Sequence, residues 1–151
     1  MTIKLLFICT GNTCRSPIAE GLAKKILGTE VVVSSAGMGA WDGDRASTQA
    51  LTVMKEWGVD LSGHQARRVT RELLEEADWV IPMTVEQENR LRALYPEFAG
   101  KFRRLGAWGT DGKDISDPYG GSDEVYQQSA REIEDLILEL REQLDRLLRK
   151  R

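Results

Sequence analysis

The stretch Ile3-Lys4-Leu5-Leu6-Phe7-Ile8, continued by Cys9-Thr10-Gly11-Asn12-Thr13-Cys14-Arg15-Ser16-Pro17, decides the fold of this chain. Its first six residues are mostly apolar, with β-branched and aromatic members, as in a central strand that is covered on both faces. Pro17 is typical of the first turn of a helix, and Ser16 is a candidate N-cap before it. The stretch therefore predicts a strand, a tight loop and a helix in direct succession.

The loop between this strand and this helix has the residues of an anion cradle. Gly11 permits a positive φ and Asn12 tolerates one, so successive backbone N–H groups can point at one centre beside the helix N-terminus. The guanidinium fork of Arg15 matches a tetrahedral oxyanion. A cysteine at a strand end is usually buried and inert. With the arginine six positions later, however, Cys9 lies in a positive field that favours the thiolate. We therefore predict a nucleophile that forms a phosphocysteine.

Apolar runs and amphipathic stretches alternate along the rest of the chain. We expect helices over 17–27, 46–57, 70–77, 84–95 and 123–148, and strands over 31–33, 78–83 and, more weakly, 101–105. This alternation predicts an α/β fold, a doubly wound three-layer sandwich whose four-stranded parallel sheet carries helices on both faces. We expect residues 1–151 to form a single domain. Ligands of such sheets bind beyond the carboxyl ends of the strands, where the Cys9 loop lies.

Composition excludes several other classes of protein. The chain has 151 residues, a net charge of −3, one His and two Cys. This charge gives no reason to expect a nucleic-acid or membrane partner, and no apolar stretch has the length of a membrane span or the context of a signal peptide. Two cysteines fit a reducing compartment, and no Cys/His cluster has metal-ligand spacing. We therefore expect a cytoplasmic protein that uses no metal or cofactor. We also expect a monomer, although the composition does not decide the oligomeric state.

Phosphoryl transfer also needs a carboxylic acid that protonates the leaving group from the side opposite the nucleophile. The long loop of residues 106–122 offers three aspartates. We predict that Asp117 is this acid, because Pro118 stiffens the chain beside it and Tyr119 can form a pocket wall. The other two aspartates fit turn positions.

Four further side chains have two interpretations each. Ser16 caps the helix or donates its hydroxyl proton to the Cys9 sulfur, and both can hold. Cys14 is a small packing residue or a redox partner that forms a disulfide with Cys9 on oxidation. His64 is a general base or, as we prefer, a structural hydrogen-bonding residue. Trp41 is a core or a pocket residue, and its Gly-rich loop favours the pocket.

Taken together, these residues resemble the low-molecular-weight protein tyrosine phosphatase family over essentially the whole chain. The stretch from Cys9 to Pro17 looks like the signature loop of that family. Three further blocks fall in the family's order, namely Ser35-Ala36-Gly37 with Trp41, Gly63-His64-Gln65-Ala66-Arg67-Arg68, and Asp117-Pro118-Tyr119.

The resemblance implies a role for each matching residue. Cys9 would be the nucleophile, Arg15 the phosphate clamp, and Asp117 the general acid that later activates water. The implied phosphate-binding loop consists of Thr10, Gly11, Asn12, Thr13, Cys14 and Arg15. The implied loop supports are Asn12, Ser16, Ser35 and His64, and the implied pocket walls are Thr13, Trp41 and Tyr119.

Two positions depart from the usual family pattern and bear on the substrate. Thr13 replaces an aliphatic residue, and Gly120 replaces a second aromatic residue. Together with Asp117-Pro118-Tyr119-Gly120-Gly121, Thr13 resembles the bacterial protein-arginine phosphatase branch. A polar threonine tolerates a guanidinium, whereas a bulky aliphatic side chain suits a phenyl ring. Trp41, by contrast, resembles the tyrosine-specific members.

We favour phosphoarginine in phosphorylated protein substrates, with phosphotyrosine as the alternative. Arsenate reduction would need a later pair of cysteines, and the chain has only Cys9 and Cys14. A non-catalytic oxyanion-binding module would not need the complete set of Cys9, Arg15 and Asp117.

Overall fold

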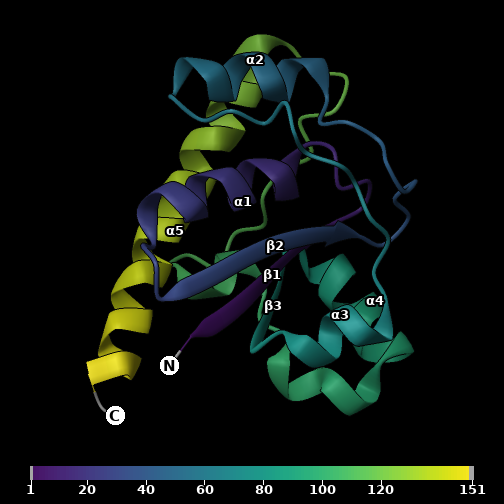
Figure 1. The fold of residues 1–151 in the computed structure, drawn as a ribbon, viewed down its shortest axis with the longest axis vertical. Coiled ribbons are helices and arrows are strands. Elements are labelled where there is room, and N and C mark those ends of the chain that lie inside the picture. The colour runs from purple at the N-terminus through teal and green to yellow at the C-terminus, as the bar shows by residue number, and fades with distance from the viewer. Residues whose placement is uncertain (1, 150–151) are drawn as a thin grey trace.

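A computed structural model describes residues 2–149 of the chain. At its centre lie the strands β1 (Ile3–Cys9), β2 (Val31–Gly37) and β3 (Trp79–Pro82). In the described part of the chain they form one parallel sheet in the order β2-β1-β3, so the first strand occupies the middle (Figure 1).

Helices cover both faces of this sheet, which confirms the predicted α/β fold (Figure 1). The α-helices are α1 (Arg15–Ile26), α2 (Thr48–Glu56), α3 (Arg71–Glu76), α4 (Val85–Leu94) and α5 (Asp123–Arg149), and the 3-10 helices are η1 (Pro96–Lys101) and η2 (Leu105–Trp108). The side chains of α1 and α5 pack on one face in a single apolar cluster, and those of α3 and α4 pack on the other.

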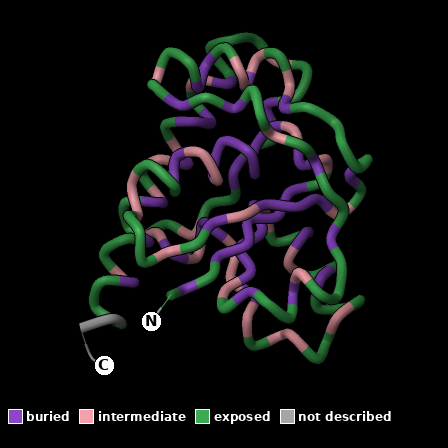
Figure 2. The backbone as a smooth tube through the Cα atoms, viewed as in Figure 1, coloured by how far each residue is buried: buried purple, intermediate pink, exposed green. Residues whose placement is uncertain are grey.

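The position of β1 explains its nearly continuous apolar sequence. Successive side chains of a strand point to opposite faces, so a strand covered on both sides needs apolar residues at every position. Leu5 and Phe7 belong to the cluster with α1 and α5, whereas Leu6 and Ile8 belong to the cluster with α3 and α4. All four are buried (Figure 2). Burial of each contributes about 2 kcal/mol to folding.

The structure does not contain the expected fourth strand over residues 101–105. Within this segment only Phe102 pairs with the sheet, through a single parallel bridge to Val80. The 3-10 helix η1 ends at Lys101 and η2 begins at Leu105, so too few extended residues lie between them to build a ladder. The side chain of Phe102 is nevertheless buried in the cluster with α3 and α4. Its apolar character therefore reflects packing in the core, because one isolated bridge does not make a strand.

The start of α1 also differs from the sequence prediction. The helix begins at Arg15 with Cys14 as the N-cap residue, and the Cys14 side chain makes no capping hydrogen bond. Ser16 is therefore the second residue of the helix and not its N-cap. Its hydroxyl contacts the Cys9 sulfur instead. The other end of the helix lies close to the expected residue 27, and Gly28 just beyond it has a φ of 81°, which glycine adopts readily.

Other boundaries follow local sequence rules more closely. Thr70 and Thr84, the first residues of two expected helices, are their N-caps, because their hydroxyls accept hydrogen bonds from Leu73 N and Gln87 N. The second helix starts two residues later than expected, at Thr48, because Ser47 caps it. The strand expected over 31–33 continues to Gly37, since its second half pairs with the end of β1.

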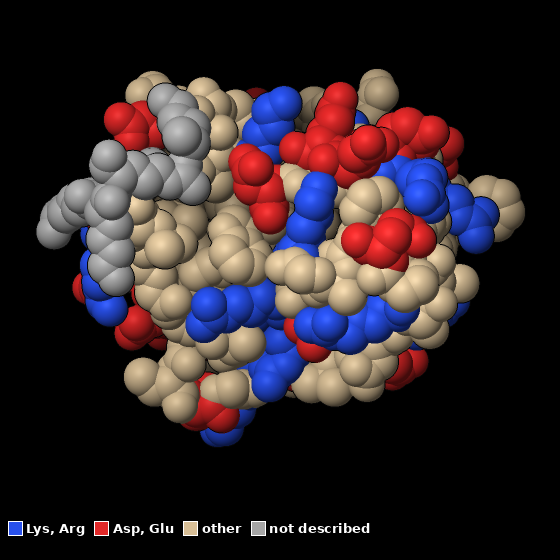
Figure 3. Space-filling view, turned by 90° about the horizontal axis from the view of Figure 1, so that it is seen from below, with Lys and Arg blue, Asp and Glu red and all other residues tan. Residues whose placement is uncertain are grey.

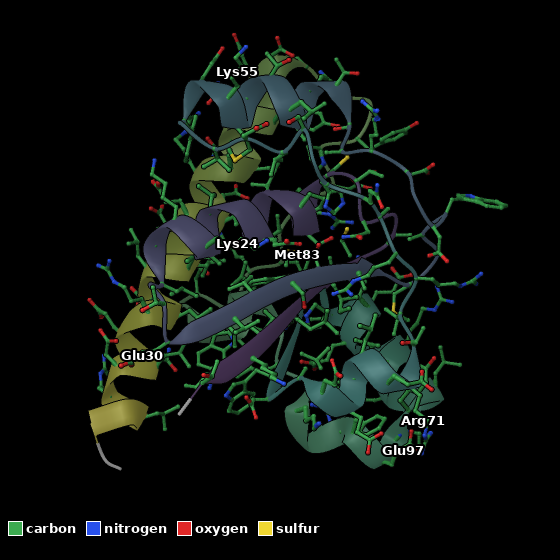
Figure 4. All side chains as sticks on the ribbon, viewed as in Figure 1. Lys24, Glu30, Lys55, Arg71, Met83 and Glu97 are labelled. Atoms are coloured by element: carbon green, nitrogen blue, oxygen red, sulfur yellow. The ribbon has the colours of Figure 1, made fainter. Side chains whose placement is uncertain are left out.

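The surface carries mixed charge. Lys and Arg side chains are interspersed with Asp and Glu on the face seen in Figure 3. Arg71 on α3 and Glu97 on η1, which lie together in Figure 4, form an ion pair at 3.2 Å. None of the helices within residues 2–149 combines the length and the apolar composition that a membrane crossing requires.

Candidate active site

The loop after β1 lies at the carboxyl edge of the sheet, and the neighbouring strand lets it curl there. Cys9 pairs with Gly37 at the end of β2. A Cβ on Gly37 would lie 2.6 Å from the Thr10 carbonyl oxygen and 2.9 Å from the Asn12 nitrogen. Both are backbone atoms that cannot move aside easily, so this close approach requires glycine.

The Cys9 sulfur sits at the base of the loop with two donors directed at it. The side chain is buried, at 3% exposure. The Asn12 N–H donates to the sulfur at 3.2 Å, and the Ser16 hydroxyl lies 2.9 Å away. Hydrogen bonds to the charged form of a thiol favour that form. Both contacts can stabilise negative charge that develops on the sulfur during a reaction.

Backbone N–H groups of the same loop remain free for an anion. Within residues 2–149, those of Gly11, Thr13 and Cys14 have no protein acceptor. They belong to a loop that leads into the N-terminus of α1, where the helix dipole also favours negative charge. The expected phosphate-binding loop, Thr10 to Arg15, thus offers donors that a tetrahedral oxyanion can accept.

Asn12 ties the loop to the elements around it. Its φ of 56° makes it the one non-glycine residue with a positive φ in the described chain. Its Nδ2 donates to Ser16 Oγ at 2.8 Å and to Ser35 Oγ at 2.9 Å, while its Oδ1 accepts from Arg67 N at 3.0 Å. The two contacts with the serines are buried, and all three hold the residue in this backbone conformation.

His64 forms a hydrogen bond with the backbone of the loop, as a structural residue would. Its Nε2 is 2.7 Å from the carbonyl oxygen of Asn12. A carbonyl oxygen can only accept, so Nε2 carries a proton and donates. The loop supports predicted from the sequence, Asn12, Ser16, Ser35 and His64, are therefore brought together.

Arg15 and Asp117 meet although they are far apart in the sequence. The Arg15 side chain is 7% exposed, and its NH1 donates to the Ile115 carbonyl at 2.9 Å. Its NH2 lies 3.7 Å from Asp117 Oδ2, whose side chain is 57% exposed. Asp117 Oδ1 also accepts from Tyr119 N at 3.0 Å, which orients the carboxylate. A screened pair of this kind stabilises the fold by less than about 1 kcal/mol, so its significance is positional.

The predicted pocket walls differ in burial, and none of them lines the cavity beside Arg15. Thr13 is half-buried, whereas Trp41 and Tyr119 are exposed, at 79% and 76%. A cavity of about 380 Å³ borders the loop on the side of α4. Its lining includes Thr10, Arg15, Met38, Thr84, Gln87 and Asp117, but none of the three predicted walls.

Cys14 is buried, and its sulfur faces hydroxyl groups. The sulfur lies 3.3 Å from the Tyr126 hydroxyl and 3.6 Å from Ser47 Oγ. Burial, and after it the hydrogen bond to Cys14, raises the pKa of Tyr126 to about 12. Both cysteines are free thiols. The disulfide between Cys9 and Cys14 stays a prediction.

Sequence reasoning missed Gln87, which joins α4 to the loop. Its Oε1 accepts from Met83 N at 2.9 Å, and its Nε2 donates to Thr10 Oγ1 at 3.2 Å. Gln87 is buried at 6% exposure. The one local hint is its place in the first turn after the Thr84 cap, where a glutamine commonly turns back toward preceding backbone.

No group of three or more His, Cys, Asp and Glu side chains within residues 2–149 is arranged to hold a metal ion. A larger hollow of about 520 Å³ lies between residues 109–116 and α5. Its lining includes no arginine, whereas Arg15 lines the smaller cavity.

A parallel α/β sheet that ends in a Cys-x5-Arg loop, with an aspartate facing the arginine, defines the class of cysteine-dependent phosphatases. The sequence profile of the family described as low molecular weight phosphotyrosine protein phosphatase matches residues 4–150. The chain belongs to this family.

Individual relatives include both kinds of protein phosphatase. A protein-arginine-phosphatase of Geobacillus stearothermophilus is 40% identical over 146 residues, which cover 95% of this chain and 97% of the relative. The low molecular weight protein-tyrosine-phosphatase Wzb of Escherichia coli K12 is 38% identical over 122 residues, covering 81% and 82%.

A solved structure shares the fold of this chain. It is a cysteine-to-serine mutant of the YwlE arginine phosphatase with a phosphorylated active-site serine. It superposes with a TM-score of 0.91 at 35% identity and covers 95% of this chain and 96% of its own. The expected resemblance to the bacterial protein-arginine phosphatase branch is thus confirmed.

Proposed function

We propose that the protein hydrolyses phosphoarginine side chains of proteins through a phosphocysteine intermediate. One observation carries this proposal: the Cys9 sulfur receives two hydrogen-bond donors beside Arg15, and Asp117 faces that arginine. A nucleophile, a clamp for the phosphoryl oxygens and an acid thus surround one centre. This arrangement satisfies the geometry that phosphoryl transfer needs.

In the first step, the thiolate of Cys9 attacks phosphorus and forms an S–P bond while the P–N bond to the guanidino nitrogen breaks. The free N–H groups of the loop and the Arg15 guanidinium bind the phosphoryl oxygens, whose charge spreads in the transition state. Asp117 donates its proton to the departing nitrogen, so that neutral arginine leaves.

In the second step, water attacks the phosphocysteine. Asp117, now a carboxylate, takes a proton from this water, the S–P bond breaks, and inorganic phosphate forms. The sulfur departs as a thiolate, and the Ser16 hydroxyl and the Asn12 N–H, both at hydrogen-bond distance, stabilise it. The cycle restores both Cys9 and Asp117, and it requires no cofactor.

Two features of the site favour phosphoarginine over phosphotyrosine. Thr13 is half-buried in the loop and presents a polar side chain where a phenyl ring would favour an aliphatic wall. Gly120 has a φ of 79°, a conformation that an aromatic residue rarely adopts, and the space around it is open. The loop after Asp117 therefore carries no second aromatic residue beside Tyr119.

Phosphotyrosine is the second candidate substrate, and Trp41 favours it. An exposed indole on the loop beside the site can stack on a phenyl ring. The same three residues, Cys9, Arg15 and Asp117, would perform the reaction. We also propose that residues 1–151 act as one phosphatase domain, as a monomer in the cytoplasm, where a reducing environment keeps both thiols free.

The deciding experiment compares kcat/KM on a phosphoarginine peptide and on a phosphotyrosine peptide of otherwise identical sequence. We expect phosphoarginine to be preferred, and Thr13→Ile to shift the ratio toward phosphotyrosine. A wild-type preference for phosphotyrosine, or an unchanged ratio in Thr13→Ile, would refute the argument from Thr13. Failure to hydrolyse either peptide, with phosphate still bound, would favour a non-catalytic module, and arsenate turnover with a thiol reductant would favour a reductase.

A further inference from the structure

Glu20, a carboxylate behind the active-site loop, is connected to the nucleophile although the proposed reaction steps do not use it. It lies one turn after Ser16 on α1, so the two side chains share a face of the helix. Its Oε1 accepts from the Ser35 hydroxyl at 2.5 Å, and its Oε2 pairs with Lys24 Nζ at 2.6 Å. The Glu20 side chain is 19% exposed, while Lys24, labelled in Figure 4, is 58% exposed. The carboxylate thus joins a surface cation to a buried hydroxyl on β2.

The directions of the hydrogen bonds between Glu20 and Cys9 follow from a count of protons. Because Arg67 N–H donates to one terminal atom of the Asn12 amide, that atom is the oxygen and the other is the NH₂ group. Both NH₂ protons are then used, one on Ser16 Oγ and one on Ser35 Oγ. Each serine oxygen therefore accepts from Asn12 and has its own proton left to donate.

These two remaining protons point away from Asn12 in two directions. The Ser16 proton goes to the Cys9 sulfur at 2.9 Å, and the Ser35 proton goes to Glu20 Oε1. Ser35 is only 3% exposed, so solvent offers its hydroxyl little alternative. Hydrogen bonds in such a chain polarise one another. A carboxylate that accepts the Ser35 proton therefore makes the Ser35 oxygen a stronger acceptor for the Asn12 amide.

We propose that Glu20 is a positioning residue for the nucleophile. By accepting the Ser35 proton, Glu20 fixes the Ser35 oxygen as an acceptor for the Asn12 amide. The same amide donates to the Ser16 oxygen, so the Ser16 hydroxyl is oriented to donate its proton to Cys9. The inference rests on the proposed phosphocysteine chemistry. If Glu20 is removed, the buried Ser35 hydroxyl loses its acceptor and the Asn12 amide loses a fixed partner.

Glu20 acts at a distance from the substrate in this proposal. Neither Glu20 nor Lys24 lines the cavity beside Arg15 and Asp117. Both line a separate hollow of about 180 Å³, which His64 also borders. A change at Glu20 should therefore affect the state of the thiol and kcat, with little effect on KM.

The test follows the reactivity of Cys9 without any phosphorylated substrate. Iodoacetamide alkylation of Cys9, identified by mass spectrometry, is measured against pH in the wild type, Glu20→Ala, Glu20→Gln and Lys24→Met. We expect Glu20→Ala to raise the pH midpoint of alkylation by about one unit, which lowers the thiolate fraction about tenfold below that midpoint. Turnover should fall by a similar factor while KM changes less than about twofold.

The other variants separate the hydrogen bond from the surface ion pair. Glu20→Gln retains an oxygen that can accept the Ser35 proton, so it should recover most of the loss. Lys24→Met removes the ion pair alone and should behave like the wild type. An unchanged midpoint in Glu20→Ala, or an equal loss in Lys24→Met, would overturn the proposal.

A second comparison serves if Glu20→Ala does not fold, which thermal unfolding would reveal. In a Ser35→Ala background Glu20 is disconnected from Asn12, and no buried hydroxyl is left without an acceptor, so adding Glu20→Ala should change the midpoint no further. An additional shift would overturn the proposal. Because alkylation needs no phosphorylated peptide, a protein that hydrolyses neither candidate substrate still gives a result. Failure of the proposed function is thus distinguishable from failure of the role of Glu20.

Discussion

Truncation of Asn12 tests the architecture of the site most directly, because the hydrogen bonds of the loop pass through this residue. The side chain is 0% exposed and bonds to Ser16, Ser35 and the N–H of Arg67. Its φ of 56° lies in the left-handed region. Asn12→Ala removes all three hydrogen bonds and leaves a Cβ in that region. Asn12→Gly removes the same hydrogen bonds but adopts the backbone conformation freely, so it is the matched control.

The expected loss of stability follows from these contacts. Each intramolecular hydrogen bond contributes about 1 kcal/mol net, so the three together contribute about 3 kcal/mol. A left-handed conformation costs alanine about 1 kcal/mol more than glycine. We therefore expect the free energy of unfolding to fall by about 4 kcal/mol in Asn12→Ala and by about 3 kcal/mol in Asn12→Gly. Both should remain folded at 25 °C if the wild type has the stability of an ordinary domain, about 5–15 kcal/mol.

Equilibrium unfolding in urea, followed by tryptophan fluorescence, measures this difference, since the chain has four tryptophans. The midpoint should move to lower urea with an unchanged slope. Turnover should fall in both variants, because Ser16 and Ser35 lose the amide between them. If the free energy of unfolding fell by less than about 1 kcal/mol in Asn12→Ala, the contribution assigned to the three hydrogen bonds would be wrong. An Asn12→Gly variant less stable than Asn12→Ala would refute the argument from φ.

Three further outcomes follow from the site. Cys9→Ser should abolish turnover while phosphate still binds in a calorimetric titration, and loss of phosphate binding would contradict the assigned loop. Asp117→Ala should slow substrates with poor leaving groups most and p-nitrophenyl phosphate least, because nitrophenolate leaves without a proton; an equal loss on both would mean that another group is the acid. The raised pKa of Tyr126, about 12, means that the folded state favours the neutral phenol. Its contribution to stability is complete below about pH 10 and is lost as the pH rises toward 12, so Tyr126→Phe should melt with a weaker dependence on alkaline pH.

The sequence predicted the local parts of the site because those parts depend on neighbours in the chain. The order of apolar strand, Gly-containing loop and helix places Cys9 and the loop N–H groups within one short segment. The Thr70 and Thr84 caps are likewise local, since a hydroxyl bonds to a nitrogen three residues later. The expected strand over 101–105 failed because its apolar residues indicate burial, and Phe102 is buried without a partner ladder.

The sequence by itself thus predicted the nucleophile, the arginine six residues after it, and the alternation of elements that places both at the edge of a parallel sheet. The sequence also predicted Asp117 as the acid, but only the tertiary structure shows that this side chain meets Arg15. Only the tertiary structure shows, too, that Gln87 contacts Thr10 and that Glu20 contacts Ser35. Spacing along a chain reports only on residues of the same element. Contacts between elements depend on register and packing, which no periodicity in the sequence encodes.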